Sequence, residues 1–520
     1  MSVSYIKAVE TENFEEFELA REQFGFILNE LVSVDKAHSE HGDIEYFLDE
    51  EGNELIRRLL QGYLDMRSNK EIKHNAVTGE DGIERNHVRE GCQRQLESQF
   101  GTVKATRIGY GKKGIDSLFP LDMELNLPTD KYSHGLKNRA VAEAVKNSFD
   151  EGVSALELTT GGKVPKRQLE LLIANVSCDF SQFYESQEPK AVDDENDILV
   201  LSADGKGIIM IDKALREITR KNAERKKKKG KVRLKSSKKK HKKKNQKRMA
   251  EVAAVYDVEP NIRVASDIIT LPKEEQDANA TEPSEATQEN ETIRPKAKNK
   301  RVWGRVEEDM EYVIQELIEE ALRRDPEQKR PWVMLVDGHV QQLKIIKKLI
   351  KKNQVNMTII IDIVHVLEYL WQAAWCFFDK KKEVDEADKW VAERASAILN
   401  GRASHVAAGM RRSATQRTLS KKKRKNIDKC ADYLLKYKAY LCFDNYLSKG
   451  FPIASGIIEG ACRHLINDRF DITGARWGLQ TAEGVLKLRA IKSSGDLDEY
   501  YQFYKEQELK RNYQEMKIAA

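Results

Sequence analysis

The spacing of apolar residues changes character along the first third of the chain. In "FEEFELAREQFGFILNELVSV" apolar side chains recur every three or four residues, which predicts helix over most of residues 1 to about 70. Residues 101–132 alternate apolar and polar positions and contain Gly and Pro, so they predict a short hairpin followed by a loop. The chain is thus expected to begin with helices and to continue into a small β-element.

Residues 134–180 have helical spacing again, in three stretches separated by breaks. They are "GLKNRAVAEAVKNSF", "DEGVSALELTTG" and "KVPKRQLELLIANVSCDF". Three short helices with a turn before a basic third helix are typical of a helix-turn-helix. Lys163, Lys166 and Arg167 stand where a recognition helix would begin and would meet phosphates or base edges. A plain three-helix packing unit with a solvated basic face is an equally good interpretation.

From residue 197 onward, short apolar runs alternate with helical patterns. The predicted strands lie in "DILVLSADGKGIIMID", "MAEVAAVYDVEP", "WVMLVDG" and "NMTIIID", and the predicted helices in "DMEYVIQELIEEALRR" and "QQLKIIKKLIKK". Such alternation predicts a layered α/β core. Residues 366 to about 447 are almost entirely helical in pattern, and "IIEGACRHLINDRF" predicts a further helix with Ser455 as its N-cap.

The formal net charge of +5 conceals a strongly basic segment. Residues 221–248 hold 17 of the 89 Lys and Arg residues and one acid, so the rest of the chain is net acidic. Residues 272–299 are of low complexity and are predicted to be disordered. The basic tract has two interpretations, a loop between strands and a DNA-binding segment, and we expect both to hold.

The six cysteines form no CxxC pair, which argues against a disulfide framework or a cysteine zinc site and fits a reducing compartment. The chain begins without an apolar signal core and contains no run of about 18 apolar residues. These features predict a soluble, intracellular protein that does not enter a membrane.

Acids follow or interrupt the apolar runs in the second half of the chain. Asp204, Asp337 and Asp362 are each predicted to end a strand, and Glu459 stands in the apolar context "PIASGIIEGACRH". Ligands bind at the carboxyl ends of strands in such sheets, and clustered carboxylates suit two Mg²⁺ or Mn²⁺ ions in phosphoryl transfer. Each acid also has a structural interpretation, as a turn former, an N-cap or a partner of a helix dipole.

Several blocks of the sequence resemble a known family. They are "YSHGLKNRAVAEAVKNSFDEGV", "TTGGKVPKRQLE", "SADGKGI", "LVDGHVQQL", "IIIDIVHVLEYLWQAAWCF", "GFPIASGIIEGACRHLINDRFDITGARWGL" and "AEGVLKLRAIKSSGDLDEYY". Together they extend from about residue 100 to 505 and resemble the DDE transposases of bacterial insertion sequences, in particular the ISKra type.

The resemblance implies an α/β fold with an RNase H-like mixed-sheet catalytic core. It implies a catalytic, metal-holding triad of Asp204, Asp337 and Glu459, with a large α-helical insertion before the last acid. Asp362 and His365 match the [C/D]xxH element of related Mutator-like and hAT-like enzymes. With a helix beginning near residue 362, both side chains would share one face, hydrogen-bond each other and support the site.

The expected domains follow from these patterns and from the resemblance. The helical N-terminal region spans 1–95, and a hairpin with a helix-turn-helix-like domain spans 96–190. The first part of the core spans 191–371, the helical insertion 372–449, and the last core helix with C-terminal helices 450–520.

The expected function is that of a transposase that binds terminal inverted repeats, cuts DNA with two metal ions and joins the freed 3′-hydroxyl to target DNA. A dimer or larger assembly on DNA and a cytoplasmic, nucleoid-associated location are implied as well. The alternatives are an RNase H-like nuclease without strand transfer and a decayed transposase acting as a DNA-binding regulator. The predicted DNA contacts, besides the three residues of the helix-turn-helix, are Arg463, Arg476, Trp477, Lys226, Lys238 and Lys242. For Arg463, Arg476 and Trp477, packing or plain surface charge is the alternative interpretation.

Overall fold

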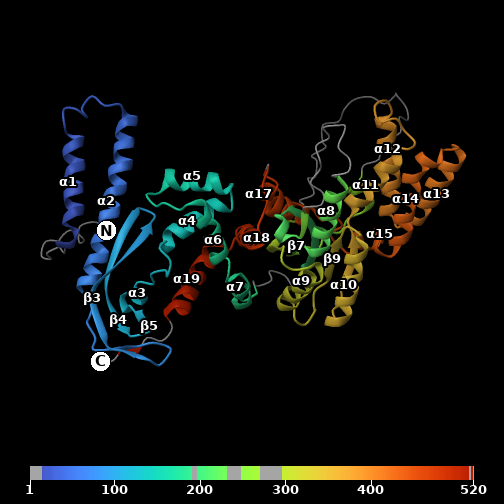
Figure 1. Cartoon of the computed structure of the whole chain (residues 1–520). Coiled ribbons are helices and arrows are strands. Elements are labelled where there is room, and N and C mark those ends of the chain that lie inside the picture. The colour runs from blue at the N-terminus through green and yellow to red at the C-terminus, as the bar shows by residue number, and fades with distance from the viewer. Residues whose placement is uncertain are drawn as a thin grey trace. The chain divides into compact units, whose positions relative to one another are not determined.

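The chain folds into two compact units with mixed α/β structure. One unit contains Met1–Ser186 and Asp496–Ala520, and the other contains Gln187–Gly495. The computed structural model, drawn in Figure 1, describes residues 15–189, 196–230, 247–269, 295–472, 474–513 and 517–518. The predicted segment 450–520 is therefore divided between the units, because its last helix belongs to the unit that holds the N-terminal residues.

The first unit begins with the helices that the apolar spacing predicts. A short 3₁₀ turn, Glu15–Phe17, leads into α1 (Glu18–Leu31), and α2 (His41–Asn69) packs against both α1 and β4. Leu64 of α2 joins Leu96, Val103 and Ala105 in a buried cluster. Because one face of α2 is buried against the sheet, apolar residues recur every three or four positions in its sequence.

A three-stranded antiparallel sheet follows, in the order β3-β4-β5. Its strands are β3 (His87–Ser98), β4 (Gly101–Lys112) and β5 (Ile115–Leu118). The hairpin predicted within residues 101–132 is confirmed by β4 and β5. The partner strand β3 is missing from the sequence prediction, because most of its residues are polar and partly exposed, and the expected boundary after residue 95 falls within it.

Helices complete the first unit. The three helices predicted within 134–180 are confirmed as α4 (His134–Ala144), α5 (Phe149–Thr159) and α6 (Lys166–Val176), which contact one another. The remaining elements are α3 (Pro120–Glu124), α7 (Phe180–Ser186), α19 (Leu497–Tyr513) and a small sheet of β1 (Val77–Thr78), β2 (Glu84–Arg85) and β11 (Lys517–Ile518).

The second unit is built on a five-stranded mixed sheet in the order β10-β9-β6-β7-β8. Strands β6, β7 and β8 form an antiparallel meander, whereas β9 and β10 run parallel to β6. The strand bounds are β6 (Ile198–Ile209), β7 (Lys247–Val258), β8 (Lys298–Arg305), β9 (Trp332–Val336) and β10 (Thr358–Ile361). The predicted α/β core with four apolar strands is confirmed, and β8 is added to it.

Two sequence expectations about these strands are wrong. The first strand does not end at Asp204, because β6 and β7 pair without interruption through Asp204↔Val252 and Gly205↔Glu251. The Asp-Gly pair there lies within a strand and makes no turn. The disordered segment predicted for 272–299 reaches too far, because β8 already begins at Lys298, while residues 270–294 lie outside the described chain.

Helices cover both faces of this sheet. On β8, Trp303 donates a hydrogen bond to Glu316 of α9 (Met310–Arg324), and a Cβ placed on the next residue, Gly304, would lie 3.1 Å from Leu486 of α18 (Leu479–Ser494). Successive residues of a strand point to opposite faces, so α9 and α18 lie on opposite faces. The crossover between β9 and β10 is α10 (Val340–Asn353).

A helical segment separates β10 from the last helices of the unit, as the sequence predicts for 372–449. Its helices are α11 (Ile363–Ala374), α12 (Val384–Leu399), α13 (Ala403–Gln416), α14 (Lys421–Tyr437) and α15 (Phe443–Ser448), with a 3₁₀ turn at Lys438–Tyr440. They pack on one another and appear in orange tones in Figure 1.

Between β6 and β7 the second unit also contains a 3₁₀ turn at Asp212–Ala214 and the helix α8 (Glu217–Gly230).

Among the residues that the structure describes, no helix combines the length and the apolar character needed to cross a lipid bilayer.

Candidate active site

Three acids that are far apart in the sequence line one hollow of about 370 Å³ in the second unit. Asp204 comes from β6, Asp337 follows β9, and Glu459 comes from the short helix α16 (Gly456–Cys462). Lys206, His365, Glu368, Arg463 and Asn467 are among the other residues that line it. The hollow therefore combines carboxylates with basic side chains.

Asp204 is held by its own strand and by α16. Its Oδ1 accepts a hydrogen bond from the Gly205 amide at 2.7 Å, and its Oδ2 lies 3.4 Å from the Cys462 thiol, which donates to it. Burial raises the pKa of Cys462, and the nearby Asp204 raises it further, so this thiol stays protonated and remains a donor.

Asp337 occupies the first position after β9 and is exposed. Its Oδ1 accepts a hydrogen bond from the His339 amide at 2.7 Å, which closes a tight turn before α10 begins. The turn-forming interpretation of this Asp-Gly pair is therefore confirmed, and Asp337 also lines the hollow.

Glu459 is exposed on the first turn of α16, a helix that packs against β6 and β7. The helical path continues without a break through a π-helical turn at Arg463–Asn467 and α17 (Asp468–Phe470), as the sequence predicts for this segment. Single π-turns are frequent at functional sites. This one begins at Arg463, whose side chain is exposed and whose Nε lies 4.0 Å from Asp468 Oδ1.

Asp362 is fully buried and joins the end of β10 to the start of α16. Its Oδ1 accepts from the Val364 amide at 2.7 Å, so Asp362 caps α11 as one interpretation of the sequence predicts. Its Oδ2 accepts from the Ser455 amide at 2.9 Å and from the Ser455 hydroxyl. Because Ser455 stands just before α16, Asp362 braces the helix that carries Glu459.

The same contacts correct two expectations. Ser455 occupies the N-cap position of α16, but its side chain does not cap the helix, because its hydroxyl donates to Asp362 instead. His365 does not bond to Asp362; its Nδ1 lies 3.4 Å from Glu368 Oε2, one turn further along α11. Asp362 is occupied by backbone and serine donors, whereas His365 lines the hollow.

Another acid, Glu251, lies on β7 close to Asp204, and it is not among the site residues that the sequence predicts. It is opposite Gly205 in the register, and a Cβ on Gly205 would lie 2.9 Å from Glu251 Oε2, so the glycine makes room for the carboxylate. Burial and the charge of Asp204 raise the pKa of Glu251 to about 7. The available signal was an acid near the start of the apolar run "AEVAAVYDV", which also contains Asp257.

The predicted metal site is consistent with the chemistry of its residues. Carboxylate oxygens of Asp204, Asp337 and Glu459 are the hard ligands that Mg²⁺ and Mn²⁺ prefer, and all three residues line the same hollow. Within the described ranges, however, no three His, Cys, Asp or Glu side chains already stand close enough to enclose an ion.

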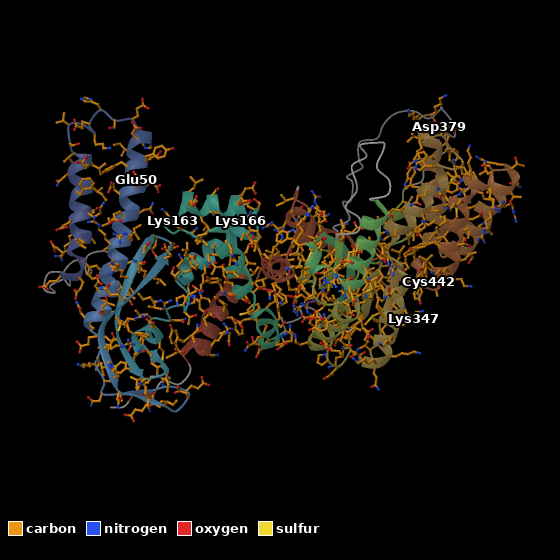
Figure 2. All side chains as sticks on the ribbon, in the orientation of Figure 1. Glu50, Lys163, Lys166, Lys347, Asp379 and Cys442 are labelled. Atoms are coloured by element: carbon orange, nitrogen blue, oxygen red, sulfur yellow. The ribbon has the colours of Figure 1, made fainter. Side chains whose placement is uncertain are left out.

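The predicted DNA-binding residues fall into three groups. Lys163, Lys166 and Arg167 are exposed at the start of α6 in the first unit, where Figure 2 labels the two lysines. Lys166 forms an ion pair with Asp150 at 2.7 Å. Lys238 and Lys242 lie outside the described residues, as does the side chain of Lys226.

The third group, made of Arg463, Arg476 and Trp477, is divided between the surface and the core, and of the three only Arg463 lines the hollow. Arg463 and Arg476 are exposed. Trp477 is 5% exposed, its ring centroid lies 4.5 Å from that of Phe470, and its backbone pairs with β6 at Ile209. A buried ring of this kind serves packing, so the structural interpretation holds for Trp477.

No protein-family model matches the chain, and no curated protein matches its sequence.

Proposed function

We propose that the protein is a DNA transposase of the DDE type that cuts and joins DNA at the hollow lined by Asp204, Asp337 and Glu459. The observation that carries the proposal is the convergence of these three acids, which come from a strand, a strand end and a helix far apart in the sequence. The same three residues are the triad that the sequence resemblance implies.

Two features of the fold support the proposal. In the mixed sheet, the antiparallel strands β6, β7 and β8 are extended by β9, which pairs with β6 in parallel, and by β10, which pairs with β9 in parallel. This arrangement fits the RNase H-like core that the resemblance implies. The helical segment between Asp362 and Glu459 stands where the resemblance requires an insertion. In the first unit, the basic start of α6 in a three-helix arrangement supports a helix-turn-helix that contacts the inverted repeats.

In this proposal Asp204, Asp337 and Glu459 would hold two divalent ions, which would supply an activated oxygen nucleophile and charge stabilisation at the phosphate. Asp204 would contribute its carboxylate from strand β6, Asp337 from the turn after β9, and Glu459 from helix α16. Lys206 and Arg463, which line the same hollow, are suited to orient the DNA backbone by ionic contact.

Hydrolysis adds water across one P–O3′ bond and leaves a 3′-hydroxyl and a 5′-phosphate. In strand transfer that hydroxyl forms a new P–O bond with target DNA and displaces another 3′-oxygen, so the number of phosphodiester bonds is conserved.

The proposal is tested by an excision assay, which measures the loss of a marked insertion sequence, flanked by its inverted repeats, from donor DNA. The wild-type chain is compared with Asp204→Asn, Asp337→Asn, Glu459→Gln and Asp362→Asn. We expect the three triad variants to abolish excision and Asp362→Asn to reduce it. Full excision with Asp337→Asn would overturn the triad assignment, and cleavage without joining would favour the nuclease alternative.

A further inference from the structure

Helix α14 of the helical segment contacts the loop that carries Asp337. The Tyr433 hydroxyl donates a hydrogen bond to the carbonyl oxygen of Asp337 at 3.1 Å. One turn later, the Tyr437 hydroxyl donates to the carbonyl oxygen of Gly338 at 2.6 Å. Both tyrosines are buried. The loop after β9 is therefore held from the helical segment as well as from the sheet.

The conformation of Gly338 depends on this close approach. Its φ is +87°, a region that glycine adopts more readily than other residues. A Cβ at this position would lie 3.1 Å from the Tyr433 hydroxyl oxygen and 3.1 Å from Ile361 Cδ1. The Asp-Gly pair thus provides an acid for the hollow and a residue small enough to accept the tyrosine.

The two hydroxyls are held in place by aromatic packing. Tyr433 stacks on Tyr369 of α11 with ring centroids 4.1 Å apart and planes 18° apart, and its ring centroid lies 4.8 Å from that of Tyr437. Burial raises the pKa of Tyr433, with smaller contributions from Tyr369 and Asp337, so the hydroxyl remains a donor at neutral pH. Stacked rings have few alternative rotamers, so the donors remain aimed at the loop.

We propose that Tyr433 and Tyr437 are positioning residues for Asp337, through which the helical segment sets the geometry of the acidic hollow. The inference rests on the proposed function, because it assigns to the helical segment a role in the chemistry of that site. Neither tyrosine is among the residues that line the hollow, so each acts through the loop backbone.

The first arm of the test measures the loop itself. Hydrogen exchange is followed on the full chain for the double variant Tyr433→Phe/Tyr437→Phe, which keeps both rings and removes only the hydroxyls. Tyr446→Phe is the matched control, because Tyr446 is a buried tyrosine of the same helical segment and no hydrogen bond within the described residues links it to residues 337–338. We expect amides of residues 337–343 to exchange about tenfold faster in the double variant, because two hydrogen bonds are lost. Exchange in the control should match the wild type.

The second arm measures chemistry and binding separately. We expect single-turnover, Mg²⁺-dependent cleavage of DNA bearing the element's ends to fall roughly tenfold to a hundredfold in the double variant, because small misplacements of a reacting group are costly. The Mg²⁺ concentration for half-maximal rate should rise, while DNA affinity and the unfolding midpoint stay close to those of Tyr446→Phe. A purely structural role would move the midpoint without a selective change in the Mg²⁺ requirement.

The outcomes separate this inference from the proposed function. Unchanged exchange in residues 337–343, or faster exchange with full cleavage, overturns the positioning role. If the wild-type protein itself shows no metal-dependent cleavage, the proposed function fails, and the exchange result then decides whether the tyrosines hold the loop.

Discussion

Asp337 and Asp362 each follow one of two neighbouring parallel strands, yet their environments differ completely. Asp337, after β9, is exposed and lines the hollow, and one of its carboxylate oxygens accepts a hydrogen bond from the His339 amide. Asp362, after β10, is 0% exposed and accepts hydrogen bonds from two amides and a hydroxyl. Position at a strand end therefore does not decide which acid is available for chemistry.

The difference arises from the segment that covers each strand end. Ser455 and the start of α16 close over Asp362, and the Ile363 amide donates to the Ile453 carbonyl at 2.9 Å. A buried carboxylate with several donors is fixed and stabilising, whereas an exposed one keeps lone pairs for a ligand. We therefore expect substitutions of Asp337 to affect activity and substitutions of Asp362 to affect stability.

The largest effect is expected for Asp337→Asn. Cleavage should fall about a thousandfold or more, since stabilisation of charge by a bound metal is worth several kcal/mol. The free energy of unfolding should change by less than about 0.5 kcal/mol, as for an exposed residue. Single-turnover cleavage and urea unfolding measure the two quantities, and loss of stability in parallel with activity would remove the contrast with Asp362.

Asp362→Ala, in contrast to Asp337→Asn, should mainly lower the stability of the fold. The free energy of unfolding should fall by about 3 kcal/mol, because buried donors of Val364 and Ser455 lose their acceptor. Ser455→Ala is the milder companion, with an expected loss of about 1 kcal/mol. Urea unfolding measures both, and a midpoint equal to that of the wild type for Asp362→Ala would contradict the bracing role.

Glu251 is a second buried acid to compare with Asp362. Its carboxylate, unlike that of Asp362, accepts no hydrogen bond within the described part of the chain. Its pKa is raised to about 7 from an ordinary value of 4.5, so the folded protein keeps a proton that the unfolded chain releases. Stability should therefore decline as pH rises from about 4.5 to about 7.

Glu251→Gln cannot ionise, so this variant should lose that pH dependence. In the absence of divalent cations it should be more stable than the wild type at pH 8, by on the order of 2 kcal/mol. Unfolding midpoints of both proteins at pH 5 and pH 8 measure the difference. Parallel pH curves would show that Glu251 does not titrate in this window.

The smallest effect is expected at the rim of the hollow. Arg463→Ala should leave stability nearly unchanged and reduce the slope of log affinity for DNA against log salt by about one. Fluorescence anisotropy over a series of salt concentrations measures the slope. An unchanged slope would assign Arg463 to its contact with Asp468 alone.

The sequence predicts much of this molecule because local patterns report local structure. The spacing of apolar residues predicts four helices and four strands of the large sheet, because one face of each element packs on a core. The helices are α1, α2, α9 and α10. The polar strand β3 and the continuation of β6 beyond Asp204 depend on pairing with distant strands, which local pattern does not report.

The candidate site shows the same limit. Asp204, Asp337 and Glu459 are identified by their context and meet at one hollow. The bond from Ser455 to Asp362 and the placement of Glu251 opposite Gly205 join segments about 50 to 90 residues apart, so only the folded chain reveals them. Trp477 likewise is predicted from the sequence as a DNA contact, and its packing on Phe470 becomes visible only in the fold.

The central claim is that the hollow lined by Asp204, Asp337 and Glu459 performs metal-dependent chemistry on DNA. Its most direct test is cleavage of a duplex bearing the element's end by the intact protein, with Mg²⁺ or with EDTA, beside Asp337→Asn and Asp362→Asn. We predict cleavage by the wild type with Mg²⁺ only, none by Asp337→Asn, and a reduced but measurable rate for Asp362→Asn. Cleavage that survives EDTA or the loss of Asp337 would contradict the account.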